Sequence, residues 1–276
     1  MTTPPAGIMN LKAAAARIRA RLVQMSHEAR APHLGSALSC VDLLVAAYWG
    51  FLRFCPGNMD DDTRDRLILS KGHAAAALYA TLAERGIIPS ELLATYGRDG
   101  SSLPEQMSPG CVPGVEAATG SLGHGLPFGL GMALAGRIRG LPYRVCVVLS
   151  DGECNEGTVW EAAMFAAAQK LETLVAMVDR NGWQATGRSN DIMALDPLKE
   201  KWQAFGWHAV DVDGHDIGQL IAELCRVPAV QGKPTVLIAR TVKGKGVSFM
   251  EDDNNWHYRI PNVQELAAAR AELGQT

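Results

Sequence analysis

The sequence predicts a three-layer α/β/α fold with a mostly parallel sheet. Short apolar segments typical of buried strands alternate along the chain with longer segments in which apolar residues recur at helical spacing. Strands joined through helices run parallel, and continuous apolar runs such as VCVVL before Ser150 indicate strands buried on both faces. The chain shows no internal repeat, low-complexity tract or linker, so we expect residues 1–276 to form a single domain.

Each element follows from its own pattern. Apolar residues at helical spacing predict a helix over 8–29, and a second helix is expected over 39–52. LILS at 67–70 predicts a short buried strand that leads into an alanine-rich helix ending near Glu84. The Gly-, Pro- and Ser-rich segment 96–121 is long enough to predict a functional loop. Beyond it we expect helices over 123–139, 156–170, 197–205, 216–226 and 262–273 and strands over 144–149, 173–178, 207–212 and 234–241.

Charge and composition exclude several classes of protein. The formal net charge of −3 gives no basic footprint for nucleic acid or an anionic membrane surface. No apolar run approaches the roughly 20 residues that span a bilayer, and the opening MTTPPAGIMN lacks the features of a secretory signal. The six cysteines are scattered without a C-x-x-C pair, which is typical of a reducing compartment. We therefore expect a cytoplasmic enzyme.

Polar residues and glycines follow four of the expected strands. In folds of this class ligands bind at the carboxyl ends of the strands, and glycines there let a ligand approach the backbone closely. The four segments are Lys71-Gly72-His73, Asp151-Gly152, Asn181-Gly182 and Lys243-Gly244-Lys245-Gly246. Together they predict a pocket at one edge of the sheet.

Asp151 and Asn181 indicate what this pocket holds. Residues 153–180 lie between the Asp-Gly and the Asn, enough for one helix and one strand, so the two strand ends become neighbours. A carboxylate and an amide oxygen suit a hard cation such as Mg²⁺, which completes its octahedron with phosphate, water or backbone oxygens. The spacing therefore leaves two interpretations about equally supported. In one, the two residues bind a metal-bridged diphosphate. In the other, Asp151 caps the next helix and Asn181-Gly182 is a simple turn.

Several motifs in order give the chain a resemblance to a known family. SDGECNEG…DRNGWQATG resembles the thiamine-diphosphate fingerprint, with Ser150 in place of its first glycine. Five further motifs are similar to those of the N-terminal, cofactor-binding domain of transketolases: APHLGS, DRLILSKGHAAAALYA, PGVEAATGSLGHGL, AFGWHAVDVDGHD and KGKGVSFMEDDNNWH. The resemblance runs from about residue 10 to 272, and it is closest to split transketolases, in which this half is a separate polypeptide.

The resemblance implies a cofactor site built from these motifs. The side chains of Asp151 and Asn181, with the backbone carbonyl of Trp183, would hold Mg²⁺ or Ca²⁺, and the metal would bind thiamine diphosphate. Gly120 and Leu122 would line the cofactor pocket, and Gly152 would let the backbone approach the diphosphate closely.

The resemblance also implies the catalytic residues. His73 and His257 would hydrogen-bond the diphosphate, and His33 would face the reacting carbons as a donor or proton shuttle. Glu156 is similar to the glutamate that joins the carboxylate network between two active sites, and a cation at Lys243 could reach the diphosphate.

Each of these residues also has a structural interpretation. Outside matching motifs, His33 would sit in a turn before a helix, His73 at a helix start, and His257 on the surface beside Trp256. The KGKG run could equally be a solvated basic loop.

The activating group of the cofactor is expected elsewhere. In the transketolase family a glutamate of a pyrimidine-binding domain activates the cofactor, and the chain offers no residues after Thr276 to build that domain. We therefore expect the pyrimidine-binding and C-terminal domains on a separate chain, a C-terminal subunit that completes an α2β2 assembly. The chain alone should be inactive.

The implied function is that of the N-terminal subunit of a thiamine-diphosphate-dependent transketolase. Such an enzyme moves a two-carbon ketol unit from a ketose or ketose phosphate donor to an aldose acceptor. The alternatives are the α subunit of a 2-oxoacid dehydrogenase decarboxylase, a 1-deoxyxylulose-phosphate-synthase-like subunit, or a non-catalytic paralogue. The first is not expected to carry SKGH or TGSLGHG, the second is normally one long chain, and the third would be expected to lose the Asp151–Asn181 pair.

Gln106 leaves the sugar open. It stands where many transketolases have a histidine that contacts the donor. A glutamine can still donate and accept hydrogen bonds, but it cannot take a proton at neutral pH.

Overall fold

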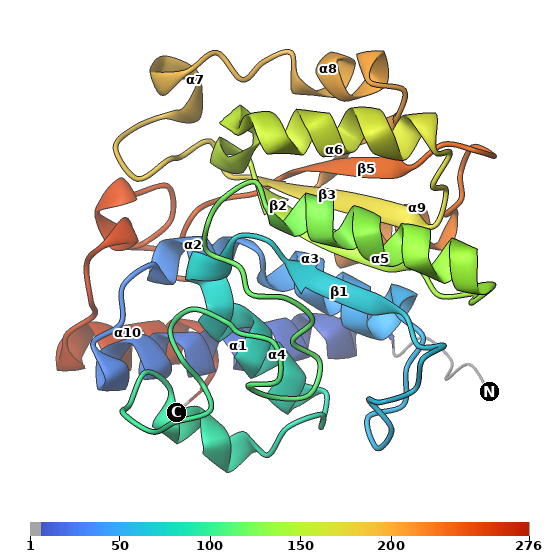
Figure 1. The fold of residues 1–276 in the computed structure, drawn as a ribbon. Coiled ribbons are helices and arrows are strands. Elements are labelled where there is room, and N and C mark those ends of the chain that lie inside the picture. Colours follow the sequence, from blue (N-terminus) through green and yellow to red (C-terminus); the bar gives the residue numbers. More distant parts are fainter. Residues whose placement is uncertain (1–6, 276) are drawn as a thin grey trace.

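Five parallel strands form the centre of the molecule (Figure 1). The computed structural model describes residues 7–275. The strand order across the sheet is β1-β2-β3-β5-β4, and every neighbouring pair is parallel. The strands are β1 Arg66–Leu69, β2 Val145–Ser150, β3 Leu174–Arg180, β4 His208–Asp213 and β5 Thr235–Arg240.

Helices connect the strands and cover both faces of the sheet. The α-helices are α1 Ile8–Ala29, α2 Leu34–Ser39, α3 Val41–Ala46, α4 Ala75–Glu84, α5 Gly125–Arg139, α6 Gly157–Ala168, α7 Ser189–Ile192, α8 Leu198–Ala204, α9 Ile217–Cys225 and α10 Val263–Glu272. Short π or 3₁₀ turns are η1 Ala47–Phe51, η2 Gly72–Ala74, η3 Ser90–Thr95, η4 Gly152–Asn155 and η5 Asn254–His257.

Alternate residues of each strand enter two separate cores, which is why the strands read as continuous apolar runs. Cys146 and Val148 of β2 pack with buried residues of α1, α3, α4 and α9, whereas Val145 and Val147 pack with α5, α6 and α8. Figure 1 shows these helices as two layers, with α6 and α8 on one side of the sheet and α1 and α10 on the other. The predicted three-layer α/β/α fold is thereby confirmed.

The strands and the longer helices expected from the sequence are observed, but the short helices α2 and α7 were not expected. The helix expected over 39–52 is observed as α3 followed directly by η1, which together run from Val41 to Phe51, and a break at Cys40 separates them from α2. The Ser39 hydroxyl donates to the carbonyl of Ser36 and to a carboxylate of β3, and this competition with the helix ladder ends α2. The 3₁₀ turn η3 was not expected.

The strand order brings together the four strand ends that carry polar residues. β1, β2, β3 and β5 are consecutive across the sheet, so their carboxyl ends form one continuous edge. Ser150 at the end of β2 lies in register with Asp179 of β3, which places Asp151 and Asn181 beside each other as the crossover spacing predicts. Within residues 7–275 no helix is both long and apolar enough to cross a membrane.

Candidate functional site

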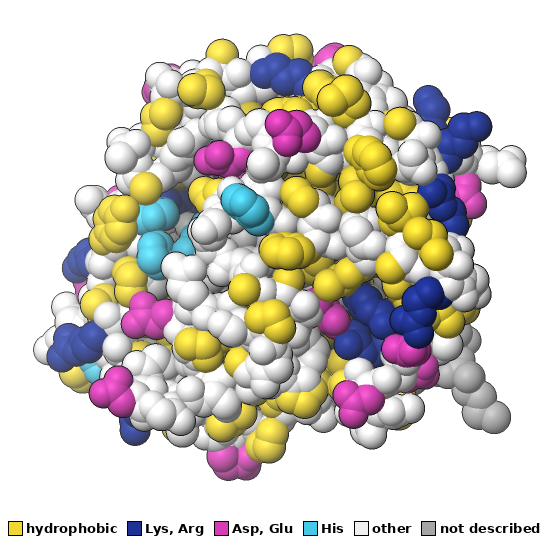
Figure 2. Space-filling model, in the orientation of Figure 1, with side chains coloured by type: hydrophobic (Ala, Val, Ile, Leu, Met, Phe, Trp, Pro, Cys, Tyr) yellow, Lys and Arg dark blue, Asp and Glu magenta, His cyan; other side chains and the backbone are white. Residues whose placement is uncertain are grey.

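A cavity of about 400 Å³ opens at this carboxyl edge. Its walls come from the ends of β1, β2 and β3, from the long loop before α5, and from α2 and η5. They comprise His33, Ser36, Lys71, His73, Gln106, Gly120, Leu122, Ser150, Gly152, Asn155, Glu156, Asn181, Trp183, Gln184, Ala185 and His257. On the face shown in Figure 2, histidine side chains gather in one area of the surface. Of the residues predicted from the sequence, only Asp151 and Lys243 are absent from the walls, and both are buried just behind them.

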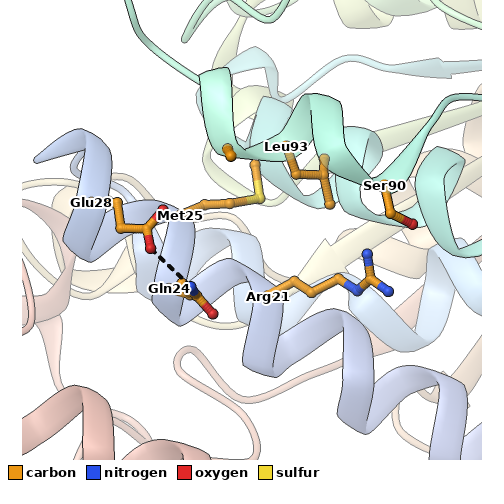
Figure 3. A pocket seen from close by; sticks show the side chains of 7 residues that line it. Arg21, Gln24, Met25, Glu28, Ser90 and Leu93 are labelled. Atoms are coloured by element: carbon orange, nitrogen blue, oxygen red, sulfur yellow. Dashed lines mark hydrogen bonds between the residues drawn. The ribbon is translucent and has the colours of Figure 1, made fainter.

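A second hollow, of about 270 Å³, lies away from this edge between α1 and η3 (Figure 3). Met25 and Leu93 form its apolar wall, and Arg21 and the hydrogen-bonded pair Gln24 and Glu28 form its polar one. None of the residues predicted from the sequence lines it.

Three histidines converge on the cavity. The ring centroids of His33 and His257 are 4.9 Å apart, and those of His33 and His73 are 5.5 Å apart. His33 adopts a left-handed backbone conformation with φ of 70°, and its amide donates to the carbonyl of His257 over 2.7 Å. A non-glycine residue held at positive φ stores strain that its surroundings must offset, and such residues are common at functional sites.

Two lysines lie at the cavity, Lys243 just behind its wall and Lys71 paired with Asp179. Burial, then the charge of Lys71, lowers the pKa of Lys243 to about 8. The ammonium of Lys243 lies 2.6 Å from Asn254 Oδ1 and 3.1 Å from Nδ1 of His257. Burial and these cations lower the pKa of all three histidines, that of His257 to about 4. The histidines are therefore neutral near pH 7, and a bound anion would offset the mutual repulsion of the two lysines.

Asp151 joins the two strand ends. Its Oδ1 accepts from the amide of Gly152 over 2.8 Å, and its Oδ2 accepts from the amide of Gly182 over 2.8 Å and the hydroxyl of Ser189 over 3.0 Å. The alternative in which Asp151 caps the following helix is confirmed for the 3₁₀ turn η4, whose N-cap is Asp151, whereas the N-cap of α6 is Glu156.

The surroundings of Asp151 fit a cation. Burial, together with the charge of Asp179, raises the pKa of Asp151 to about 6. In the described part of the chain no Lys or Arg donates a hydrogen bond to this carboxylate. The carboxamide of Asn181 lies at the cavity wall, with its Oδ1 accepting from the amide of Trp183 over 3.0 Å. Over residues 7–275 no cluster of three His, Cys, Asp or Glu side chains could hold a metal, so any cation here depends on amide and backbone oxygens as well.

The buried pair of Lys71 and Asp179 was not predicted from the sequence. Both side chains are fully buried, and they form an ion pair beneath the cavity. Lys71 also donates to the carbonyl of Ser36 over 2.9 Å, and Asp179 accepts from the hydroxyls of Ser39 and Thr241. Burial opposes ionisation, but the mutual attraction raises the pKa of Lys71 and lowers that of Asp179, so both are charged.

The loop before α5 is fixed to the strand ends by a buried carboxylate. Glu153 accepts from the hydroxyl of Ser70 and from the amides of Gly123 and Ser150, over 2.8 and 3.2 Å for the two amides. This bonding places Gly120 and Leu122 on the wall of the cavity, and Glu156 remains exposed at its mouth. The sequence did not single out Glu153, because no local pattern showed that its partners would include Ser70 and Gly123, which lie far away in the chain.

Comparison with known proteins decides the family. The protein-family model described as "Transketolase, thiamine diphosphate binding domain" matches residues 10–276. The chain belongs to the transketolase family. It is 39% identical to an apulose-4-phosphate transketolase subunit of Phocaeicola vulgatus over 93% of this chain and 91% of that protein. It is 41% identical to the 6-deoxy-6-sulfo-D-fructose transketolase subunit SqwG of a Clostridium species, over 87% of this chain and 88% of that protein.

Solved transketolases share the fold. The transketolase of Campylobacter jejuni superposes with a TM-score of 0.91 and 26% identity, over 98% of this chain and 43% of that one. A transketolase of Pichia stipitis gives a TM-score of 0.91 and 28% identity, over 96% of this chain and 41% of that one. The chain thus spans about two fifths of the solved transketolases that it matches. These findings confirm the predicted family, and the chain is the N-terminal, thiamine-diphosphate-binding part of a transketolase, a transferase.

Proposed function

We propose that the chain holds the diphosphate of thiamine diphosphate through a divalent cation and acts in two-carbon ketol transfer with a second subunit. The observation that carries the proposal is the cavity itself. It places a buried carboxylate without a cationic hydrogen-bond partner beside two lysines and three neutral histidines. A metal–diphosphate pair would offset both excess charges at once, because the cation would meet Asp151 and the phosphates would meet Lys243.

The cation, Mg²⁺ or Ca²⁺, would be held by the side chains of Asp151 and Asn181 and by the backbone carbonyl of Trp183. The position of Asp151 in the turn before η4 and of Asn181 at the end of β3 supports this set. Because the amide of Trp183 already donates to Asn181, the turn is preformed and its oxygens need little reorganisation.

The phosphates would meet His73, His257 and Lys243. Since Lys243 donates to Nδ1 of His257, the remaining proton of that imidazole resides on Nε2 and is available to a phosphate oxygen. The open backbone at Gly152 admits the diphosphate, with Gly120 and Leu122 completing the wall.

His33 would act at the reacting carbons. When bound, thiamine diphosphate supplies the carbon nucleophile and the electron sink for cleaving a carbon–carbon bond. His33 lowers the cost of proton movement at a substrate hydroxyl, because burial and the charge of Lys243 lower its pKa and keep it neutral.

The substrate would meet Gln106. This side chain lines the cavity, and its Oε1 occupies the space that a Cβ on Gly120 would fill. A glutamine there would bind sugar hydroxyls by hydrogen bonds without exchanging protons. We therefore expect a sugar substrate that differs from the donor sugars of transketolases with a histidine at this place.

A second subunit would complete the site and supply the activating glutamate, giving an α2β2 assembly. Two relatives of nearly the same length as this chain are themselves named as one subunit of a transketolase. The helices α5 and α6 start at the mouth of the cavity and expose Phe128, Ile138, Met164 and Phe165. Exposed apolar side chains in such number suit a partner, and Glu156 at the same mouth would meet it. The six free cysteines suit a cytoplasmic location for the assembly.

Calorimetric titration with thiamine diphosphate tests the proposal. Binding to the chain mixed with its C-terminal subunit should require Mg²⁺ and disappear with a chelator. Saturable binding that is indifferent to the metal, or no binding at all, would contradict the proposed site. Ketol transfer catalysed by the purified chain alone would contradict the need for a partner.

A further inference from the structure

His215 lies outside the cavity, in the turn between β4 and α9, at the end of a row of buried polar groups. Arg19 of α1 makes a two-pronged ion pair with Asp42 of α3, with nitrogen–oxygen distances of 2.6 and 3.2 Å. The Oδ2 of Asp42 is also 2.7 Å from Nδ1 of His215. The backbone amide of Val242 then donates to Nε2 of His215 over 2.8 Å.

These contacts determine the tautomer of His215. A backbone amide can only donate, so Nε2 is the acceptor and carries no proton. The ring proton therefore resides on Nδ1 and is donated to Asp42, whose ionisation is maintained by Arg19. Burial alone would raise the pKa of Asp42, but the charge of Arg19 and the hydrogen bonds from His215 and Arg19 together outweigh it, and the pKa is lowered. The imidazole is thus a neutral bridge of fixed direction between α3 and Val242.

Val242 opens the segment that carries Lys243. The amide of Gly244 donates to the carbonyl of Gly35 over 2.9 Å, and Lys243 donates through its ammonium to Asn254 and His257. Gly35 packs closely against Lys243, since a Cβ added to Gly35 would lie only 3.2 Å from Cγ of that lysine. Lys243 is fully buried, so a small shift of its backbone would move the ammonium relative to the cavity.

We propose that His215 is a positioning residue for the cofactor site: by accepting the amide of Val242 it fixes the backbone from which Lys243 meets His257. The inference rests on the proposed function in its assignment of Lys243 and His257 to the diphosphate. It adds a residue that touches neither cofactor nor substrate, and it connects α1 and α3 to the site through Arg19 and Asp42. Without the bridge, Val242 would lose its partner and Lys243 would gain solvent.

Two variants separate positioning from simple stabilisation. In His215→Gln the side-chain oxygen reaches the place of Nε2 and can still accept from Val242. In His215→Asn the amide nitrogen reaches the place of Nδ1 and can still donate to Asp42, but Val242 loses its acceptor. His208→Gln, at the other end of β4, is the matched control. Lysine ¹⁵Nζ NMR reports the pKa of Lys243 without any ligand, and the Lys243→Met spectrum assigns its signal.

If His215 positions Lys243, His215→Asn raises the pKa of Lys243 from about 8 toward its model-peptide range, and His215→Gln and His208→Gln leave it unchanged. Affinity of the assembled enzyme for thiamine diphosphate and Mg²⁺ should fall about tenfold in His215→Asn and by less than about twofold in His215→Gln. The inference is overturned if Asn and Gln variants have the same Lys243 pKa and the same affinity, whatever their melting temperatures. A wild-type enzyme that binds no cofactor contradicts the proposed function instead, since the pKa comparison needs no ligand.

Discussion

The two ends of the sheet each hold a buried carboxylate, but with opposite surroundings. Asp65, at the amino end, accepts from the guanidinium groups and backbone amides of both Arg53 and Arg144. Burial opposes its ionisation, but these hydrogen bonds outweigh it and lower the pKa of Asp65. Asp151, at the carboxyl end, receives only amide and hydroxyl donors, and its pKa is raised to about 6.

The difference separates a structural charge from a binding charge. Asp65 is neutralised by the protein itself, so its contribution is to hold the starts of β1 and β2 together. The buried charge of Asp151 costs free energy in the unliganded chain, and in the proposed function a bound cation would offset that cost. The comparison therefore predicts that equal substitutions at the two ends have different consequences.

The largest expected effect is that of Asp151→Asn on cofactor binding. If Asp151 ligates the cation as proposed, the substitution should weaken Mg²⁺-dependent binding of thiamine diphosphate by about 100-fold or more, measured by calorimetry on the assembled enzyme. The melting temperature of the unliganded chain should stay the same or rise, because an uncompensated buried charge is removed.

Asp65→Asn is the matched variant at the amino end. It leaves two arginines without their carboxylate and should lower the free energy of unfolding by about 3 kcal/mol, which lowers the melting temperature by roughly 6–10 °C. Cofactor affinity per folded molecule should not change. If Asp151→Asn melts as Asp65→Asn does and binds cofactor normally, the distinction between the two ends is wrong.

The two ends should also respond to opposite ends of the pH scale. Lys243 has a pKa of about 8 in the free protein because of burial and the charge of Lys71, and a bound diphosphate must raise it. Above pH 8, binding therefore takes up a proton, and affinity should fall by up to about tenfold per pH unit. Lys243→Met should bind more weakly at pH 7 and lose this dependence.

At the amino end, the lowered pKa of Asp65 gives stability that is complete above the ordinary aspartate pKa of about 4 and is lost only as the pH falls further. Thermal melts from pH 3 to 9 therefore check the amino end, and titrations of affinity from pH 7 to 9.5 check the carboxyl end. An affinity that is flat between pH 8 and 9.5 would show that Lys243 does not meet the anion.

Much of this architecture could be predicted from the sequence. Strand bounds differ from the expected ones by a residue or two, because β1, β2, β3 and β5 each contain a continuous apolar run that stops at a polar residue. The neighbouring positions of Asp151 and Asn181 followed from the length of one crossover, which is a local property of the chain.

What could not be predicted depends on contacts between distant segments. Lys71 and Asp179 neutralise each other across 108 positions, and no local pattern reveals such a pair. The left-handed backbone of His33 is imposed by the carbonyl of His257, far along the chain. The bridge through His215 needs three elements to meet, although the motif VDGHD already singled out its stretch.

A smaller effect is expected from alanine at two glycines of positive φ. A Cβ on Gly120, with φ of 138°, would lie 1.7 Å from Oε1 of Gln106, so Gly120→Ala must displace that side chain. We expect about tenfold weaker cofactor or sugar binding in steady-state kinetics.

Gly140, at the end of α5 with φ of 67°, is the control. A Cβ added there would have open space around it. Gly140→Ala should cost only about 1 kcal/mol of stability and leave kinetics unchanged. Equal kinetic effects would mean that backbone strain, and not the contact with Gln106, governs the site.

The smallest expected effect compares two exposed ion pairs. Arg188 pairs with Asp252 over 2.7 Å near the cavity, and Arg139 pairs with Asp62 over 2.6 Å at the other end of the sheet. Exposed pairs contribute between 0 and about 1 kcal/mol, so neither Asp252→Asn nor Asp62→Asn should change the melting temperature appreciably.

Asp252 also accepts from the indole of Trp183 over 2.8 Å and so holds one wall of the cavity. Asp252→Asn should therefore weaken cofactor binding by about threefold, which corresponds to roughly 0.7 kcal/mol, whereas Asp62→Asn should not. Because asparagine tolerates the left-handed backbone of this position, with φ of 58°, a loss of affinity reports the released Trp183 and not a strained chain.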